Sequence, residues 1–177
     1  MSTIIRSGAT PLPRLLGTLV CGVLVVGLAA GCGGLDEEGQ KSADSLSRAF
    51  QAEGLTAKDA DCVARGWVED SGRETLQDQG VLTKDGAFNT KNTERPDKAV
   101  LESYVDAYFD CVDYGKYEAI QYDKRRPDII NKDRFAACAN RIDQDDARKA
   151  MLDDLLGKSS ETSTEVNHQL IQCVTNG

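Results

Sequence analysis

The sequence predicts an all-α domain, a compact bundle of about six to seven helices made of two tandem half-units with one disulfide each. Three observations lead to this prediction. Apolar residues recur at helical spacing along most of the chain, and no stretch alternates convincingly between apolar and polar residues. Four of the six cysteines of the chain lie in the predicted helical domain, where they form an even set. We expect the helical domain at residues 42–177, with possible half-units at residues 55–117 and 128–177.

The helices of the first half are marked by capping residues. Gly54 followed by Leu55 is typical of a helix end, and Thr56 is placed to cap the next helix. Ser71 starts a predicted capping box, which indicates a short third helix, and Pro96 suits the first turn of a longer one. The apolar positions of these helices are Ala43, Leu46, Ala49 and Phe50, then Ala60, Val63, Ala64 and Trp67, then Leu76, then Val100, Tyr104, Tyr108, Cys111 and Val112.

The second half repeats this order of signals. Asn131 precedes a helix, Asp143 is expected to cap another, and Thr162 starts a second predicted capping box. Leu76 and Leu152 each lie fourteen residues after the first cysteine of their half. This shared offset and the repeated order of signals predict a duplicated unit, although coincidence among amphipathic helices would produce similar spacing.

The predicted helical domain contains four cysteines, Cys62, Cys111, Cys138 and Cys173. They indicate two disulfides rather than a metal site, because no two are close in sequence and the chain has a single histidine. If the unit is duplicated, the economical pairing is Cys62–Cys111 with Cys138–Cys173, and the other two pairings stay open. Gly66, one turn after Cys62, predicts a close approach of two helices there.

The N-terminal segment has the features of a secretory signal. Arg6 and Arg14 precede an apolar run at residues 15–30, which is too short and glycine-rich for a membrane span of roughly 20 residues. The run ends in Leu28-Ala29-Ala30-Gly31-Cys32, which resembles the lipobox of bacterial lipoproteins, with Ala29 where that family usually has Leu.

This resemblance implies that residues 1–31 are a signal peptide and that Cys32 takes a diacylglyceryl group. The protein would then be anchored to the cell membrane by lipid, facing the extracytoplasmic side. Two alternatives stay open: an ordinary signal cleaved after Ala29-Ala30, and an uncleaved N-terminal anchor. The mature region also resembles, in general style, small lipoproteins with paired cysteines from high-GC Gram-positive bacteria, and this second resemblance implies no activity.

Cleavage would make an already acidic chain more acidic. The full chain has a formal net charge of −8, and loss of Arg6 and Arg14 takes it to −10. Such a body is repelled by phosphate backbones, so we expect no nucleic-acid partner. Residues 32–41 are expected to form a flexible, acidic tether to the membrane.

The sequence predicts no catalytic residue, no metal site and no cofactor. His168 is interpreted as a solvated residue, and the acids at residues 143–146 as helix-start residues, since Arg148 stands where a calcium loop requires glycine. The aromatic residues are more distinctive, because all five tyrosines fall between residues 104 and 122. The candidate contact surface is formed by Tyr114, Tyr117, Tyr122, Arg125 and Arg126.

A connector whose rings cover the edge of the core explains the same tyrosines. Two functions of different class therefore stay open. The first is a non-catalytic binding or scaffolding module for an unknown envelope protein or polymer. The second is an envelope hydrolase that uses acidic residues, which predicts a cleft in which carboxylates converge.

Overall fold

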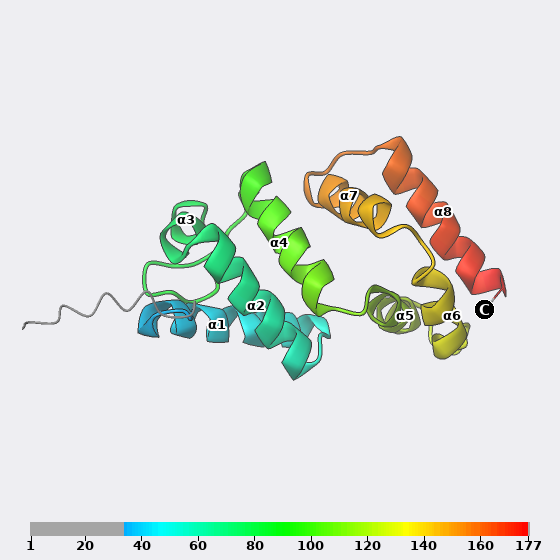
Figure 1. Ribbon diagram of the computed structural model, residues 1–177, viewed down its shortest axis with the longest axis horizontal. Coiled ribbons are helices and arrows are strands. Elements are labelled where there is room, and N and C mark those ends of the chain that lie inside the picture. The colour runs from blue at the N-terminus through cyan, green and yellow to red at the C-terminus, as the bar shows by residue number, and fades with distance from the viewer. Residues whose placement is uncertain (1–33, 177) are drawn as a thin grey trace, which may run out of the picture. The chain divides into compact units, whose positions relative to one another are not determined.

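The computed structural model describes residues 34–176, so the predicted signal segment and Cys32 lie outside the described residues. Within that range the chain is all-α, with eight helices and one isolated bridge between Leu82 and Phe88 in place of any strand. The helices (Figure 1) are α1 (Glu37–Glu53), α2 (Ala57–Ser71), α3 (Arg73–Asp78), α4 (Lys98–Cys111), α5 (Tyr114–Arg125), α6 (Lys132–Ala139), α7 (Gln144–Leu155) and α8 (Glu161–Asn176).

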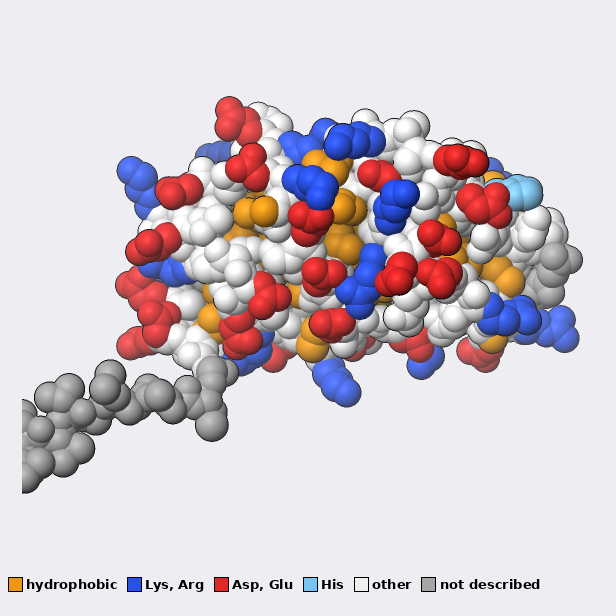
Figure 2. Space-filling view, turned by 45° about the horizontal axis from the view of Figure 1, so that its top comes forward, with side chains coloured by type: hydrophobic (Ala, Val, Ile, Leu, Met, Phe, Trp, Pro, Cys, Tyr) orange, Lys and Arg blue, Asp and Glu red, His pale blue; other side chains and the backbone are white. Residues whose placement is uncertain are grey.

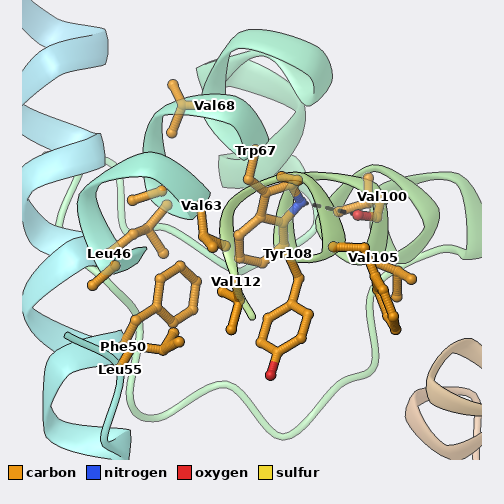
Figure 3. Close-up of a cluster of buried hydrophobic side chains, with 14 of the residues drawn as sticks. Leu46, Phe50, Leu55, Val63, Trp67, Val68, Val100, Val105, Tyr108 and Val112 are labelled. Atoms are coloured by element: carbon orange, nitrogen blue, oxygen red, sulfur yellow. Dashed lines mark hydrogen bonds between the residues drawn. The ribbon is translucent and has the colours of Figure 1, made fainter. Parts of the chain in front are cut away.

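Helices α1, α2 and α4 pack around the larger of two hydrophobic cores. Leu46 of α1, Val63 of α2 and Tyr108 of α4 are at most 1% exposed (Figure 3). The indole nitrogen of Trp67 donates a hydrogen bond of 2.9 Å to the backbone oxygen of Val100, so the one polar atom of this side chain is satisfied. The apolar stripes predicted from the sequence are therefore the buried faces of these helices.

Most of the predicted helix boundaries are confirmed. Thr56 caps α2 by accepting a hydrogen bond of 3.2 Å from the backbone N–H of Asp59, and Asn131 caps α6 by accepting one of 3.1 Å from Arg134. Gly54 ends α1 with a φ of 112°, a conformation that a residue without Cβ adopts at low cost.

The two predicted capping boxes are wrong. Ser71 is the last residue of α2, and its hydroxyl lies 2.5 Å from that of Ser103, so α3 begins without a side-chain cap. Helix α8 is capped by Ser160 rather than by Thr162. Ser160 and Ser163 each accept a 3.0 Å hydrogen bond from the other's backbone N–H, which satisfies two free donors at once.

A second, smaller core lies among α5, α6 and α8. Phe135 and Cys173 are at most 2% exposed there. Helix α5 lies so close to α6 that a Cβ added at Gly115 would be 2.3 Å from the backbone oxygen of Ala136. Because of this close approach, a glycine is required at the contact. The backbone N–H of Gly115 also donates a 2.7 Å hydrogen bond to the side chain of Asn140.

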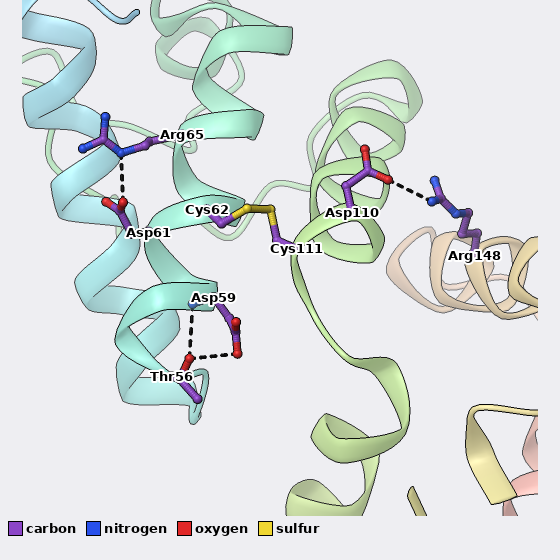
Figure 4. Close-up of a disulfide and its surroundings, with 8 residues drawn as sticks. All are labelled: Thr56, Asp59, Asp61, Cys62, Arg65, Asp110, Cys111 and Arg148. Atoms are coloured by element: carbon purple, nitrogen blue, oxygen red, sulfur yellow. Dashed lines mark hydrogen bonds and ion pairs between the residues drawn. A yellow bond between two sulfur atoms is a disulfide. The ribbon is translucent and has the colours of Figure 1, made fainter. Parts of the chain in front are cut away.

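Helices α4 and α7 connect the two groups of helices. Arg148 of α7 donates hydrogen bonds of 2.8 Å to Asp106 and 3.1 Å to Asp110 (Figure 4 shows the second). The same guanidinium lies 5.2 Å from the ring centroid of Phe109, a cation–π contact. One arginine therefore ties α7 to three residues of α4.

Both disulfides join helices within one half of the chain, as the economical pairing predicts. Cys62–Cys111 connects α2 to α4 (Figure 4), and Cys138–Cys173 connects α6 to α8. The first helix of the half-unit that starts at residue 55 is α2, and that of the half-unit that starts at residue 128 is α6, so each bridge begins at the first helix of its half-unit. The packing around the bridges differs, however, since α2 contacts both α3 and α4 whereas in the second half it is α8 that contacts both α6 and α7. The duplication stays a prediction.

Three details of the predicted organisation are wrong. Helix α1 begins at Glu37, because Asp36 caps it by accepting a 2.7 Å hydrogen bond from Gly39, so half of the expected tether at residues 32–41 is helical. The expected connector after residue 113 is helix α5, which brings the count to eight within the described range. The half-unit boundary at residue 117 therefore falls inside a helix.

The close helix approach predicted at Gly66 is confirmed, and it yields a stability prediction. A Cβ at this position would lie 3.1 Å from the Cβ of Ala107 on α4. We expect Gly66→Val to lower the free energy of unfolding by about 1–3 kcal/mol, because α4 must move while the Cys62–Cys111 bridge still holds it. Urea unfolding measures the loss. In a double-mutant cycle, Ala107→Gly should recover much of it, and no recovery would contradict the contact.

Candidate functional site

The five residues predicted as a contact surface do not share one surface. The rings of Tyr114, Tyr117 and Tyr122 are partly buried and pack against aromatic rings of α4 or α6, at centroid distances of 5.3, 5.4 and 5.6 Å. Arg125 and Arg126 are exposed. The three rings cover edges of the two cores, as the packing interpretation of the tyrosines expects.

Tyr114 and Arg125 nevertheless line the same cleft, which lies between α5, α7 and α8 and is called here the α5–α7–α8 cleft. Its volume is about 370 Å³, within the range of roughly 300–1,000 Å³ that is typical of small-ligand sites. Apolar residues of α7 and α8 form much of its lining, and polar groups reach it from all three helices. The lining residues are Tyr114, Glu118, Arg125, Ala147, Ala150, Met151, Asp154, Leu155, Val166, Asn167 and Leu170.

Helix α5 places its three polar lining residues on one face. Glu118 and Arg125 lie four and eleven positions after Tyr114, and these intervals return to the same side of an α-helix. The helix begins at Tyr114 because the side chain of Asp113 accepts a 3.1 Å hydrogen bond from the backbone N–H of Lys116. The opposite wall is supplied by α7, where Asp154 is in the last turn.

Glu118 is the more buried of the two carboxylates that line this cleft. Within residues 34–175, its side chain takes part in no ion pair and no hydrogen bond. Burial raises the pKa of Glu118 above its ordinary value, the positive charge of Arg125 opposes that rise, and the negative charge of Asp154 adds to it. The carboxylates of Glu118 and Asp154 are therefore close enough to interact across the cleft.

Two tyrosines have raised pKa values to which the charge of Glu118 contributes, and of the two only Tyr114 lines the cleft. Burial raises the pKa of Tyr114 far above its usual range, and the charges of Glu118 and Asp154 add to the rise, so its hydroxyl stays protonated. Tyr108 is 1% exposed, and its hydroxyl, which points away from Trp67 in Figure 3, has no hydrogen-bond partner within the described structure. Burial also raises the pKa of Tyr108, with contributions from Tyr117 and Glu118.

Glu118, Asp154 and Asn167 are not among the site residues predicted from the sequence. One signal was present for Glu118, because the positions three and four residues away on its helix hold glycine, glutamine and two tyrosines. No basic residue within α5 is therefore spaced to pair with this carboxylate. Asp154 and Asn167 carry no comparable local signal, since only the packing of α7 and α8 brings them to the cleft.

The unpartnered carboxylate predicts a pH-dependent effect of Glu118→Gln on stability. Because the pKa of Glu118 is raised in the folded state, the folded protein binds more protons than the unfolded chain, and stability falls as the pH rises through the raised pKa. We therefore expect Glu118→Gln to raise the thermal midpoint at about pH 7 and to leave it unchanged at about pH 3.

Calorimetry at the two pH values measures this difference. Glu94→Gln is the matched control, since it removes an exposed carboxylate in the loop before α4 and should leave the midpoint similar to that of the native protein at both pH values. A lower midpoint of Glu118→Gln at neutral pH would contradict the prediction.

The remaining sequence candidates have structural explanations. His168 is exposed on α8 and lies at the surface in Figure 2, where acidic and basic side chains are interspersed. Asp143 caps α7 by accepting hydrogen bonds of 3.0 and 3.2 Å from two backbone N–H groups. In the part of the chain that the structure covers, no three or more His, Cys, Asp or Glu side chains are grouped so as to hold a metal ion.

No helix among residues 34–176 combines the length and the apolar character needed to cross a membrane. Comparisons of this chain with protein-family models, with curated proteins and with solved structures found no match. Its function is therefore inferred from its own residues.

Proposed function

We propose that this protein is a non-catalytic binding module, anchored through lipid at Cys32 to the outer side of a bacterial plasma membrane, and that its ligand occupies the α5–α7–α8 cleft. The observation that carries the proposal is the composition of this cleft. It combines an apolar lining with polar side chains that converge from three helices, as sites for small ligands and for exposed parts of larger partners do.

Two features support the location outside the cytoplasm. The sequence Ala29-Ala30-Gly31-Cys32 has the small residues and the cysteine that lipidation requires. The disulfides Cys62–Cys111 and Cys138–Cys173 are of a kind that persists in oxidising compartments. The expected ligand is an envelope protein or polymer, since the mature charge of −10 disfavours nucleic acid.

A photo-reactive methionine analogue tests whether the cleft is occupied in living cells. The chain has two methionines, Met1 and Met151, and Met151 lines the cleft. Cells that incorporate the analogue and are then illuminated should yield a cross-linked product through Met151, identified by mass spectrometry. Met151→Leu is a conservative change that should abolish the product.

A blocking variant makes the same test specific to the cleft. Asn167→Trp places a large ring at the rim and should remove the product, whereas Ile171→Trp, one turn further along α8 at a 58% exposed position, should retain it. Equal recovery of the product from both variants would sink the proposed site.

The pair Glu118 and Asp154 favours a second candidate, the hydrolase that uses acidic residues. A protonated carboxyl and an ionised carboxylate can act as general acid and general base in glycoside hydrolysis. Because burial raises the pKa of Glu118 whereas Asp154 is exposed, Glu118 would be the acid and Asp154 the base. This assignment uses only residues of the cleft.

Incubation of the purified protein with isolated cell-wall polymer tests the second candidate. Release of new reducing ends should be lost in both Glu118→Gln and Asp154→Asn and should persist in Glu94→Gln. A native protein that releases no reducing ends would exclude the hydrolase and leave the binding module.

A further inference from the structure

We infer that the ligand of the α5–α7–α8 cleft presents an organic ammonium group attached to an apolar body, with Glu118 and Asp154 as its counter-ions. This inference rests on the proposed function, which makes the cleft a binding site. It goes further by naming the chemistry that the cleft selects.

Two carboxylates of the cleft have no ion-pair partner within the described residues. Glu118 reaches the cleft from α5 and Asp154 reaches it from α7. The basic residue of the lining is Arg125, which is exposed and donates a 3.2 Å hydrogen bond from its Nε to the backbone oxygen of Gln121. Arg125 forms no ion pair with either carboxylate in the described structure, so a cation from outside can lie between them.

Other acidic residues of the same protein do have basic partners. Asp106 and Asp110 share Arg148, at 2.8 and 3.1 Å, and Asp123 lies 2.6 Å from Lys132. The hydrogen bond from Lys132 lowers the pKa of Asp123, whereas burial raises that of Glu118. An ammonium group bound in the cleft would give Glu118 the kind of partner that Lys132 gives Asp123.

Apolar side chains line the cleft together with the carboxylates. Ala147, Ala150, Met151 and Leu155 line the cleft from α7, and Val166 and Leu170 line it from α8. This surface would bury an alkyl or aromatic group and gain from its removal from water. It therefore favours an amine that carries an apolar group over a bare ammonium ion.

The donor set disfavours a metal ion. Calcium takes about six to eight oxygen ligands and magnesium about six, whereas this cleft offers two carboxylates. No third acidic, histidine or cysteine side chain joins them within the described chain. Apolar side chains such as Met151 and Leu155 line the cleft together with the two carboxylates, and this combination suits an organic cation.

The ring of Tyr114 supplies an observation that does not depend on the missing ion-pair partners of the carboxylates. The electron-rich ring of a tyrosine attracts an ammonium group, and Tyr114 lines the cleft beside Glu118.

Titration with three small molecules of matched size tests the inference. The probes are n-butylammonium, n-butanol and butyrate, added to the full-length protein in nanodiscs and followed by saturation-transfer NMR. We expect n-butylammonium to bind about tenfold more tightly than n-butanol, the difference produced by one charge-assisted contact, and butyrate to show no saturable binding.

Variants locate the binding. Glu118→Gln and Asp154→Asn should each weaken n-butylammonium binding about tenfold, and Glu94→Gln, which makes the same change in net charge outside the cleft, should leave it unchanged. Asp154 is exposed, so its variant folds even if Glu118→Gln perturbs the packing of α5. Asn167→Trp should abolish binding by filling the rim.

Three results would overturn the inference. They are equal binding of n-butanol and n-butylammonium, binding of calcium or magnesium that displaces n-butylammonium, and n-butylammonium binding that survives in both carboxylate variants. If photo-cross-linking through Met151 succeeds while n-butylammonium fails to bind, the ligand class is wrong and the proposed binding site stands. If both fail, both proposals fall.

Discussion

Removing the Cys62–Cys111 disulfide is expected to lower the free energy of unfolding by about 4 kcal/mol. The bridge joins residues 49 positions apart, so it restricts the unfolded chain strongly. It also holds α2 against α4, the two helices that supply Val63 and Tyr108 to the larger core. Replacement of both cysteines by serine, followed by urea unfolding under non-reducing conditions, measures the loss.

The second bridge is the matched comparison. Cys138–Cys173 closes a separation of 35 residues, for which the same chain-entropy argument also gives about 4 kcal/mol. A loss below about 1 kcal/mol for the Cys62–Cys111 variant would contradict the prediction, because it would mean that the bridge does not restrict the unfolded chain as this argument requires.

Phe135→Ala is expected to lower the free energy of unfolding by about 3–5 kcal/mol. Phe135 is 1% exposed, lies in the smaller core and packs against Tyr122 at a centroid distance of 5.6 Å. This core has few buried side chains, so the structure cannot easily collapse onto the space that the ring leaves. We expect α5, α6 and α8 to loosen before the helices of the larger core.

Hydrogen–deuterium exchange tests where the loss is felt. Peptides from α5, α6 and α8 should lose protection in Phe135→Ala, whereas peptides from α1 and α2 should keep it. Phe135→Leu retains most of the buried volume and should show a smaller effect. A uniform loss of protection along the chain would show that the two cores unfold as one unit and would contradict the prediction.

The helices that were predicted correctly have strong local signals. A stripe such as Val63 and Trp67 repeats at the helical period, and Thr56, Asn131 and Asp143 supply the caps. Helix α5 lacks such a stripe, because its buried residues are Gly115 and Ala119. Small residues mark a close helix contact only once the partner helix is known, which is why α5 looked like a connector.

The candidate site was harder to predict than the fold. The sequence pointed to Tyr114 and Arg125, which do line the cleft, but also to Tyr122 and Arg126, which do not. The choice among these residues depends on which face of α5 meets α7 and α8. Periodicity identifies residues that share a helix face, but it cannot say which partner that face meets.

The sequence by itself determined the all-α class, the even set of four cysteines, most helix boundaries and the charge of the chain, because each follows from composition or from contacts within a few residues. Only the tertiary structure decided that Glu118 and Asp154 both line one cleft, and that neither forms an ion pair within the described residues. The two residues are far apart in the sequence, and the burial and neighbouring charges that shift the pKa of a carboxyl exist only after the helices have packed.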